Sequence, residues 1–441
     1  MGQDWLVDLL TKGQMSSAAG EAADINNNQE GIFMKKRLVA LLLAGVMALS
    51  MAACGSGGSD SGSGGSGSGE TAGGQDAESA ASDMKIAMIT DSGDITDQSF
   101  NQTTYETCKA WAEANGADFN YYKPESDSNE ARNASVDQAV ADGANVVVMP
   151  GYMFAATIVA QSEMYPDVKF IALDVGSGDI CEKGVGEGYD YAHPEQYKAE
   201  DYYNTDNVYC CTYQEELSGY MAGYAAVKLG YRHLGFLGGM SVPAVTRFGY
   251  GYVQGADKAA EELGVSGDVE IEYVCGGQFY GDADITAYMD TWYGSKGVEV
   301  VFACGGGIYT SAVEAAAKTD GKVIGVDSDQ KPIIDATKEG MTVTSAMKGL
   351  ATTVNNVLTD IAAGKWSDHV GKIDNLGLVS ENPEENYVQL PLEGTQWGDG
   401  FTEDDYRALV KAMYSGEIEV SNDTTAMPAA TIKVNDYGSI K

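Results

Sequence analysis

The sequence has few basic residues. It carries 27 lysines and arginines against 65 aspartates and glutamates, which gives a formal net charge of −38 over 441 residues. A surface this acidic repels phosphate backbones and anionic lipid headgroups, and it favours a neutral or cationic solute. We therefore exclude nucleic acid as a partner. The plainer interpretation, an acidic surface that keeps the chain soluble, stays open beside it.

Several motifs of catalysis and metal binding are also missing. The 3 histidines, His193, His233 and His369, are not spaced as a metal-ligand pair. The sequence lacks a G-x-S-x-G nucleophile elbow and a P-loop G-x-x-x-x-G-K-[ST], and its cysteines form no C-x-x-C pair. These absences disfavour catalysis and ATP hydrolysis, so we expect no metal site and no cofactor.

An export signal lies near the start of the chain. Met34 is followed by three basic residues, by an apolar run over Leu38–Leu49 and by Ser50-Met51-Ala52-Ala53-Cys54. This order is typical of a signal peptide, and its last residues resemble a bacterial lipobox with Met51 where leucine is usual. Lipidation of Cys54 would hold the protein to a membrane, on its extracytoplasmic face.

The segments around this signal complete the N-terminal organisation. We interpret residues 1–33 as an extension upstream of the true start and residues 34–53 as a lipoprotein signal peptide. Residues 54–83 consist mainly of Gly, Ser, Ala and acidic residues, which cannot offset backbone entropy by burying apolar surface, and they predict a flexible tether. The other cysteines lie in apolar or strand-like surroundings, which favours buried free thiols and leaves disulfides open.

From Met84 onward, short apolar runs alternate with amphipathic stretches. Runs such as Asn145-Val146-Val147-Val148-Met149 predict strands buried on both faces, and hence a parallel sheet covered by helices. The predicted strands of a first unit are Lys85–Thr90, Asp118–Tyr122, Val146–Pro150 and Lys169–Asp174, with helices over Phe100–Asn115, Asn129–Asp142 and Ala155–Tyr165. Residues 175–206 are rich in Gly, Asp and Tyr, and we expect a long surface insertion there.

The same alternation then restarts. It predicts strands over Val208–Tyr213, His233–Leu237, Val269–Cys275, Val298–Ala303 and Lys322–Asp327, with helices over Glu215–Leu229, Arg247–Leu263, Asp284–Gly294 and Tyr309–Lys318. We therefore expect an α/β protein with two doubly wound parallel-sheet lobes joined by a hinge. Lobe 1 covers 84–212 with return segments after about 328, and lobe 2 covers 213–327 with part of the C-terminal region.

Polar and aromatic residues follow several predicted strands. Because ligands bind beyond the carboxyl ends of parallel strands, we expect a cleft at these positions. The groups are Asp91, the Ser99-Phe100-Asn101 helix start, Asp174, Phe279-Tyr280, Gly305-Gly306-Gly307 and Asp327. Each group alone is explained equally well by a turn, a helix cap or packing between the lobes. Because the groups come from both units and converge on one place, together they favour a pocket.

The sequence also resembles a known family. Thr90-Asp91-Ser92-Gly93, Asp97-Gln98-Ser99-Phe100-Asn101-Gln102 and Ser345-Ala346-Met347-Lys348-Gly349 are similar to segments of the basic membrane protein family of substrate-binding lipoproteins. The resemblance also includes Gly238-Gly239-Met240 with Pro243 and Arg247-Phe248, and it runs from about Lys85 to at least Leu350. It implies a type I periplasmic-binding-protein fold that serves an ABC importer, with a permease and an ATPase as partners.

The resemblance further implies a nucleoside, most readily a purine nucleoside, closed in between the lobes of a monomer. Phe100 and Phe279 would stack on the base, and Asn101 and Asp174 would bond its polar edge. Ribose would be bound by Asp91, Gly305 or Gly306, Asp327 and Lys348. Two alternatives stay open: a receptor of the same fold for a sugar or another small solute, and a nucleoside-cleaving hydrolase.

Overall fold

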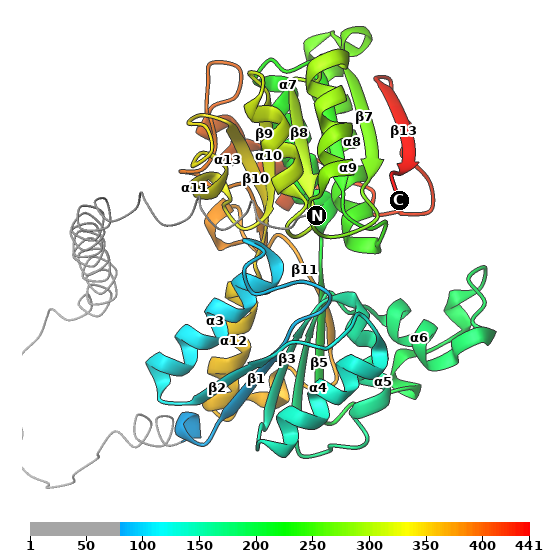
Figure 1. Cartoon of the computed structure of the whole chain (residues 1–441), viewed down its shortest axis with the longest axis vertical. Coiled ribbons are helices and arrows are strands. Elements are labelled where there is room, and N and C mark those ends of the chain that lie inside the picture. The colour runs from blue at the N-terminus through cyan, green and yellow to red at the C-terminus, as the bar shows by residue number, and fades with distance from the viewer. Residues whose placement is uncertain (1–79) are drawn as a thin grey trace, which may run out of the picture. The chain divides into compact units, whose positions relative to one another are not determined.

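The computed structural model describes residues 80–441, which belong to one compact unit. The predicted extension at 1–33, the signal peptide at 34–53, Cys54 and the tether up to residue 79 lie outside these described residues. Across residues 80–441, no helix combines the length and the apolar character that crossing a membrane requires. The described chain forms two lobes, each built on a largely parallel sheet (Figure 1).

Lobe 1 contains a six-stranded sheet with the order β11-β5-β4-β3-β1-β2. All neighbouring strands in it run parallel. The central strand β3 is buried at every residue, whereas the edge strand β2 is partly exposed, as expected for a sheet with helices on both faces. The strands are β1 Lys85–Ile89, β2 Asp118–Tyr122, β3 Val146–Pro150, β4 Lys169–Leu173, β5 Val208–Tyr213 and β11 Ile373–Leu376.

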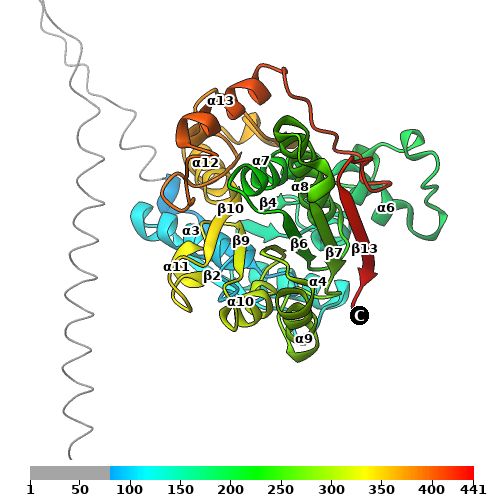
Figure 2. The same ribbon diagram turned by 90° about the horizontal axis from the view of Figure 1, so that it is seen from above.

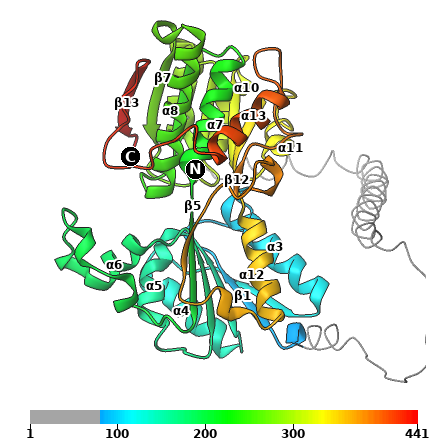
Figure 3. The ribbon, with the colours of Figure 1, turned by 180° about the vertical axis from the view of Figure 1, so that it is seen from behind.

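Helices cover both faces of this sheet. On one face, Ile86 and Met88 pack with residues of α3 and α12, which lie side by side in Figures 1 and 3. On the other face, Ala87 and Ile89 pack with residues of α4, α5 and α6. The helices are α3 Phe100–Asn115, α4 Asn129–Ala141, α5 Ala155–Gln161, α6 Ser177–Val185 and α12 Leu350–Ala362.

Lobe 2 contains a seven-stranded sheet with the order β12-β10-β9-β8-β6-β7-β13. The short β12 is antiparallel to β10, and the other neighbouring pairs are parallel. The late strand β13 lies along β7 at the sheet edge (Figure 2). The strands are β6 His233–Gly238, β7 Glu270–Cys275, β8 Val300–Cys304, β9 Lys322–Asp327, β10 Thr342–Lys348, β12 Val388–Gln389 and β13 Lys433–Ser439.

Two hydrophobic clusters cover the faces of this second sheet. One contains residues of α7, α8 and α13, and the other contains residues of α9, α10 and α11. Helices α7 and α8 approach each other through glycines: a Cβ added at Gly223 would lie 2.1 Å from the carbonyl oxygen of Tyr252. The helices are α7 Glu215–Lys228, α8 Pro243–Leu263, α9 Ala283–Thr291, α10 Tyr309–Ala317, α11 Lys331–Ile334 and α13 Glu403–Tyr414.

The chain passes between the lobes at three places in the described region. It leaves lobe 1 between β5 and α7, returns between β10 and α12, and leaves again between β11 and β12. In Figures 1 and 3 these segments run through the waist of the unit. Such crossings place the carboxyl ends of both sheets opposite each other, where a ligand site is expected.

The predicted fold class, two α/β lobes with parallel sheets, is confirmed. Some details of the predicted elements differ. Residues 177–185 of the expected insertion form α6, which continues the strand-helix alternation, and the remainder up to β5 includes short 3₁₀ helices. Helix α8 begins at Pro243 rather than at Arg247, because proline suits the first turn of a helix, where its missing N–H is not needed.

Candidate ligand-binding site

A cavity of about 650 Å³ lies between the lobes, at the carboxyl ends of strands from both sheets. Residues of lobe 1 and lobe 2 both line it, so a bound solute would contact both halves of the protein. All nine predicted ligand-binding residues lie in its wall: Asp91, Phe100, Asn101, Asp174, Phe279, Gly305, Gly306, Asp327 and Lys348. The structure therefore brings together residues that are up to 257 positions apart in sequence, from Asp91 to Lys348.

In the part of the cavity wall that lobe 1 contributes, polar side chains after β1 form a hydrogen-bonded group. The amide nitrogen Nδ2 of Asn101 donates to Asp91 Oδ1 at 3.0 Å and to Asp97 Oδ2 at 3.0 Å. The backbone N–H of Gly93 also donates to Asp91, at 2.7 Å. Burial raises the pKa of Asp91 to about 6, against the lowering effect of these donors. Asp91 and Asn101 thus have fixed orientations at the cavity wall before any solute binds.

The two predicted aromatic residues enter the wall from different lobes. Phe100 is the first residue of α3 in lobe 1 and is almost fully buried. Phe279 follows β7 in lobe 2 and packs against Gly305, where an added Cβ would lie 3.0 Å from the ring. Gly305 and Gly306 have φ values of 145° and 53°, a region of backbone conformation that favours glycine. The turn after β8 therefore requires these two glycines, which leave room for the ring of Phe279 at Gly305 and for its backbone at Gly306.

A hydrogen bond joins the lobes beside the cavity. Ser99 Oγ, at the start of α3, donates to Asp327 Oδ2 at the end of β9, at 2.5 Å. Burial raises the pKa of Asp327 to about 6, while Lys348 and Ser99 act to lower it. Gln98, Asp174 and Asp327 have φ values of 56°, 60° and 65°, and they are the described non-glycine residues with positive φ. Strained backbone of this kind concentrates at functional sites, and here all three residues lie at or next to the cavity.

Four charged residues meet at the end of β10, of which Glu215 and Lys348 are buried and Asp174 and Arg247 are partly buried. Lys348 Nζ lies 2.5 Å from Asp174 Oδ2 and 3.1 Å from Glu215 Oε1. Arg247 Nε lies 2.5 Å from the other oxygen of Glu215. The ammonium of Lys348 also lies over the ring of Phe100, 4.9 Å from its centroid. We call Asp174, Glu215, Arg247 and Lys348 the charge cluster.

The charges of this cluster determine the protonation of its members. Burial disfavours the charged form of Lys348, but Asp174 and Glu215 outweigh it and raise the pKa of the ammonium. Burial raises the pKa of Asp174 despite its ion pair with Lys348. Burial also acts to raise the pKa of Glu215, yet Arg247 and Lys348 together lower it below its usual value. Glu215 is therefore an ionised carboxylate, and Asp174 is the acid of the cluster that takes up a proton more readily.

Sequence reasoning missed two members of the charge cluster. Arg247 belongs to a segment that resembles the family but was not predicted as a site residue, although it lines the cavity. Glu215 was not singled out either, because an acidic residue in the first turn of a helix is common for reasons of helix polarity alone. The signal for Glu215 is its position, directly after a strand and at the start of a helix that is otherwise mostly buried.

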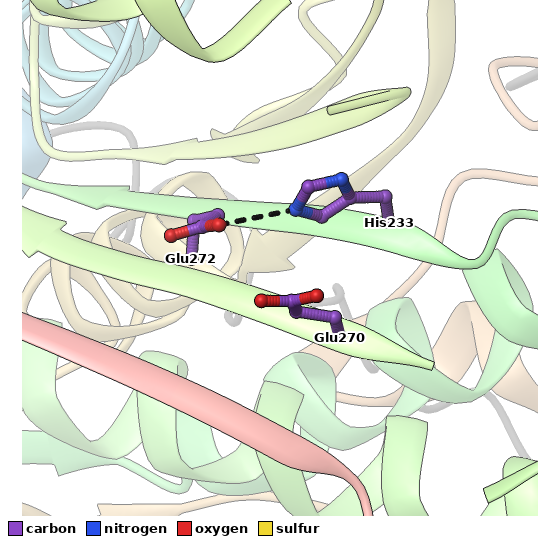
Figure 4. A group of neighbouring side chains, drawn as sticks. All are labelled: His233, Glu270 and Glu272. Carbon is purple, nitrogen blue, oxygen red and sulfur yellow. Dashed lines mark hydrogen bonds and ion pairs between the residues drawn. The ribbon is translucent and has the colours of Figure 1, made fainter. Parts of the chain in front are cut away.

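Away from the cavity, three side chains that could ligate a metal ion lie close together. His233, Glu270 and Glu272 have side-chain atoms within 4.8 Å of one another at the amino ends of β6 and β7 (Figure 4). Lys296 Nζ lies 2.8 Å from Glu272 and Lys433 Nζ lies 2.5 Å from Glu270, so ammonium groups already neutralise both carboxylates. We interpret the group as a salt-bridge cluster that fastens β13, which carries Lys433, to the sheet edge.

The cysteines within residues 80–441 are buried thiols. Cys108, Cys181, Cys210, Cys211, Cys275 and Cys304 are all free in the structure. Burial raises the pKa of the Cys210 and Cys304 thiols, which keeps them protonated and unreactive. Of the two possibilities left open by the sequence, the structure has free thiols at these positions.

Two doubly wound lobes, three crossings and one cavity with polar groups from both halves define the class of two-lobed solute-binding proteins. The family model for ABC transporter substrate-binding proteins of the PnrA-like type, called Bmp, matches residues 84–390. This chain belongs to the Bmp family, and the family resemblance seen in the sequence is confirmed.

Relatives with known names agree with this assignment. The ABC transporter nucleoside-binding protein BmpA of Lactococcus lactis subsp. cremoris is 28% identical over 326 residues, covering 71% of this chain and 82% of the relative. Basic membrane protein B of Borreliella afzelii is 25% identical over 316 residues, covering 68% of this chain and 80% of the relative. This chain is thus a substrate-binding protein of an ABC transporter.

A solved structure supports the fold independently. The ABC transporter system solute-binding proteins from Aeropyrum pernix K1 superpose with a TM-score of 0.56 at 21% sequence identity, covering 77% of this chain and 88% of that chain. At this identity the similarity concerns the fold alone.

Proposed function

We propose that the protein captures a purine nucleoside in the cavity between its lobes and presents it to the permease of an ABC importer. The observation that carries this proposal is the composition of the cavity wall. It combines an aromatic ring from each lobe, Phe100 and Phe279, with several carboxylates and the ammonium of Lys348. Aromatic planes suit a base, and carboxylates with a nearby donor suit the hydroxyl groups of a sugar.

The base would lie between the two aromatic residues. Phe100 and Phe279 would stack on its faces, and Asn101 and Asp174 would bond its polar edge. The buried Oδ1 atom of Asp174 accepts no hydrogen bond within the described part of the chain. An unpaired buried acceptor is costly, so an N–H group of a ligand at this position would be favourable. This unpaired oxygen supports the role proposed for Asp174.

Ribose would be bound by Asp91, Asp327, Lys348 and the backbone of Gly305 or Gly306. Carboxylates accept from vicinal hydroxyl groups, and the lysine donates to a hydroxyl oxygen. The acids near the cavity also argue against a phosphorylated ligand, because a phosphate would face Asp91, Asp174 and Asp327. The uncharged nucleoside is therefore the form we propose.

The volume of the cavity and the name of one relative also support a nucleoside as the ligand. Pockets for small organic ligands are usually about 300–1,000 Å³ in volume, and the cavity of about 650 Å³ falls in this range. The relative from Lactococcus lactis carries a nucleoside-binding name at 28% identity.

Binding would stabilise a closed arrangement of the lobes, because the ligand contacts both of them. The lobes would move as a hinge about the three crossings. A permease and an ATPase would be separate subunits of the importer, and we propose that the binding protein itself acts as a monomer.

A thermal-shift panel tests the ligand class. Purine nucleosides should raise the melting temperature more than ribose, free bases or glucose do. A ligand at a hundredfold excess over its Kd adds about 2.7 kcal/mol of stability, which is readily measured. A larger shift with glucose or ribose than with any nucleoside would favour the sugar receptor and contradict our proposal.

A recovery experiment separates the receptor from the hydrolase. The purified protein is incubated with inosine, and the mixture is then analysed by chromatography. We expect intact inosine after prolonged incubation. Release of hypoxanthine at a rate proportional to protein concentration would support a nucleoside-cleaving enzyme instead.

We also propose that Cys54 carries the lipid anchor and holds the protein on the extracytoplasmic face of the membrane. The order of basic, apolar and small residues before Cys54 supports this proposal. The Cys54→Ser variant should lose incorporation of labelled fatty acid and leave the membrane fraction. Equal labelling of both proteins would refute the assignment.

A further inference from the structure

Glu215 lies behind the cavity wall rather than in it. It is the first residue of α7, directly after the crossing from β5, and its side chain is fully buried. One oxygen lies 3.1 Å from Lys348 Nζ and the other lies 2.5 Å from Arg247 Nε. The carboxylate thus pairs with two cations that both line the cavity.

Lys348 occupies the corresponding position at the next crossing. It is the last residue of β10, followed by Gly349 and then by α12 in lobe 1. Its ammonium is shared between Glu215 and Asp174, which follows β4 in lobe 1. The charge cluster therefore connects two of the three crossings with a carboxylate of lobe 1.

The cluster is balanced, with two acids and two bases. A buried lysine without Glu215 would have Asp174 as its remaining close carboxylate, and Arg247 would lose its close partner. Lysine has a flexible four-carbon stem and a rotating ammonium, so its position depends on its acceptors. Lys348 donates a hydrogen bond to Asp174 and forms an ion pair with Glu215, so two carboxylates fix the ammonium in one place, and without Glu215 it would be free to move toward Asp174.

We propose that Glu215 is a positioning residue of the ligand site, which holds Lys348 and Arg247 at the cavity wall so that Lys348 reaches the solute. This inference rests on the proposed function, because its effect is measured as nucleoside binding. Glu215 does not itself line the cavity, so its influence must pass through the two cations. Nothing in the sequence pattern alone assigns it this role.

The test is a double-mutant cycle on inosine binding, measured by calorimetry with Glu215→Gln, Lys348→Met and the double variant. We expect Glu215→Gln to weaken binding about 10- to 100-fold, the factor that corresponds to a hydrogen bond with one charged partner. If Glu215 acts through Lys348, the double variant should bind no more weakly than Lys348→Met alone. A residue with a merely structural role would give losses that add.

Glu216→Gln is the matched control. Glu216 is the next residue on the same helix and is also buried, but unlike Glu215 it forms no ion pair among residues 80–441. This control should bind inosine like the wild type. Glu215→Asp keeps the charge on a shorter side chain and serves as a second variant if Glu215→Gln fails to fold. It should fold and bind inosine more weakly than the wild type but more tightly than Lys348→Met.

Two results would overturn the inference while leaving the proposed function intact. One is an unchanged Kd for Glu215→Gln, and the other is a full addition of its loss to that of Lys348→Met. If the wild-type protein binds no purine nucleoside, the proposed function fails, and the role of Glu215 in it fails as well.

Discussion

The close contact between α7 and α8 gives a prediction that depends on backbone geometry alone. Changing Gly223 to alanine would place a Cβ 2.1 Å from the carbonyl oxygen of Tyr252 and 3.0 Å from the backbone nitrogen of Ala256. Ordinary contacts between such atoms are about 3.5 Å, so the two helices must separate by about 1 Å or more. A rotation of one side chain cannot relieve this contact, because both neighbouring atoms belong to the backbone.

The expected loss combines two opposing effects. Overpacking of a buried site costs about 1–3 kcal/mol, and the separation of two long helices puts this change at the upper end. Alanine has a better helix propensity than glycine by about 1 kcal/mol, which offsets part of the cost. We therefore expect Gly223→Ala to lower the free energy of unfolding by about 2 kcal/mol.

Urea unfolding followed by circular dichroism measures this difference. Gly178→Ala is a suitable control, because Gly178 lies in α6 and an added Cβ would meet nothing within 4 Å. The control should leave the unfolding midpoint unchanged or raise it slightly. If Gly223→Ala were as stable as the control, the helices would not be held together at the distance described.

Three further predictions concern the site and its charges. Phe100→Ala and Asp327→Asn should each abolish the inosine-induced thermal shift while the ligand-free protein still melts cooperatively; a shift retained by both variants would remove these residues from the site. Lys348→Met should destabilise the protein by about 3–5 kcal/mol at pH 8, because it removes the ion-pair partner of Asp174 and the cation near Asp327. The loss should shrink as the pH falls and these acids take up protons, and a loss independent of pH between 5 and 8 would contradict this reasoning. Burial raises the pKa of Glu216 from 4.5 to about 7. Between these pH values the folded state binds more protons than the unfolded state does. Glu216 therefore makes the free energy of unfolding fall as the pH rises from about 4.5 to 7. Glu216→Gln should therefore show a smaller decrease in melting temperature across this range than the wild type, and parallel curves would refute the assignment.

The strands and helices of both lobes could be predicted largely from hydrophobic pattern. Central strands such as Val146–Pro150 are continuous apolar runs, and these runs identify buried parallel strands directly. The strands after Thr342 could not be predicted in this way. Strand β11, Ile373–Leu376, is half-exposed at the edge of its sheet, and β12 has two residues, so neither leaves a clear pattern.

The candidate site was predictable where residues follow strands. Asp91 and Asp174 follow β1 and β4, Asp327 is the last residue of β9, and the carboxyl ends of such strands converge. The partners of these residues could not be predicted, because they depend on how the two lobes face each other. The hydrogen bond from Ser99 to Asp327 joins residues 228 positions apart, and local sequence contains no information about it.

The three crossings have a consequence for separating the halves of the molecule. Each lobe is assembled from two stretches of chain, so neither could be produced by cutting the gene at a single point. Tyr213 Oη donates to Thr353 Oγ1 at 2.9 Å, which shows that the end of β5 and the first turn of α12 are already neighbours. A short peptide joining residues 213 and 350 would therefore give lobe 1 as one continuous, independently expressed polypeptide.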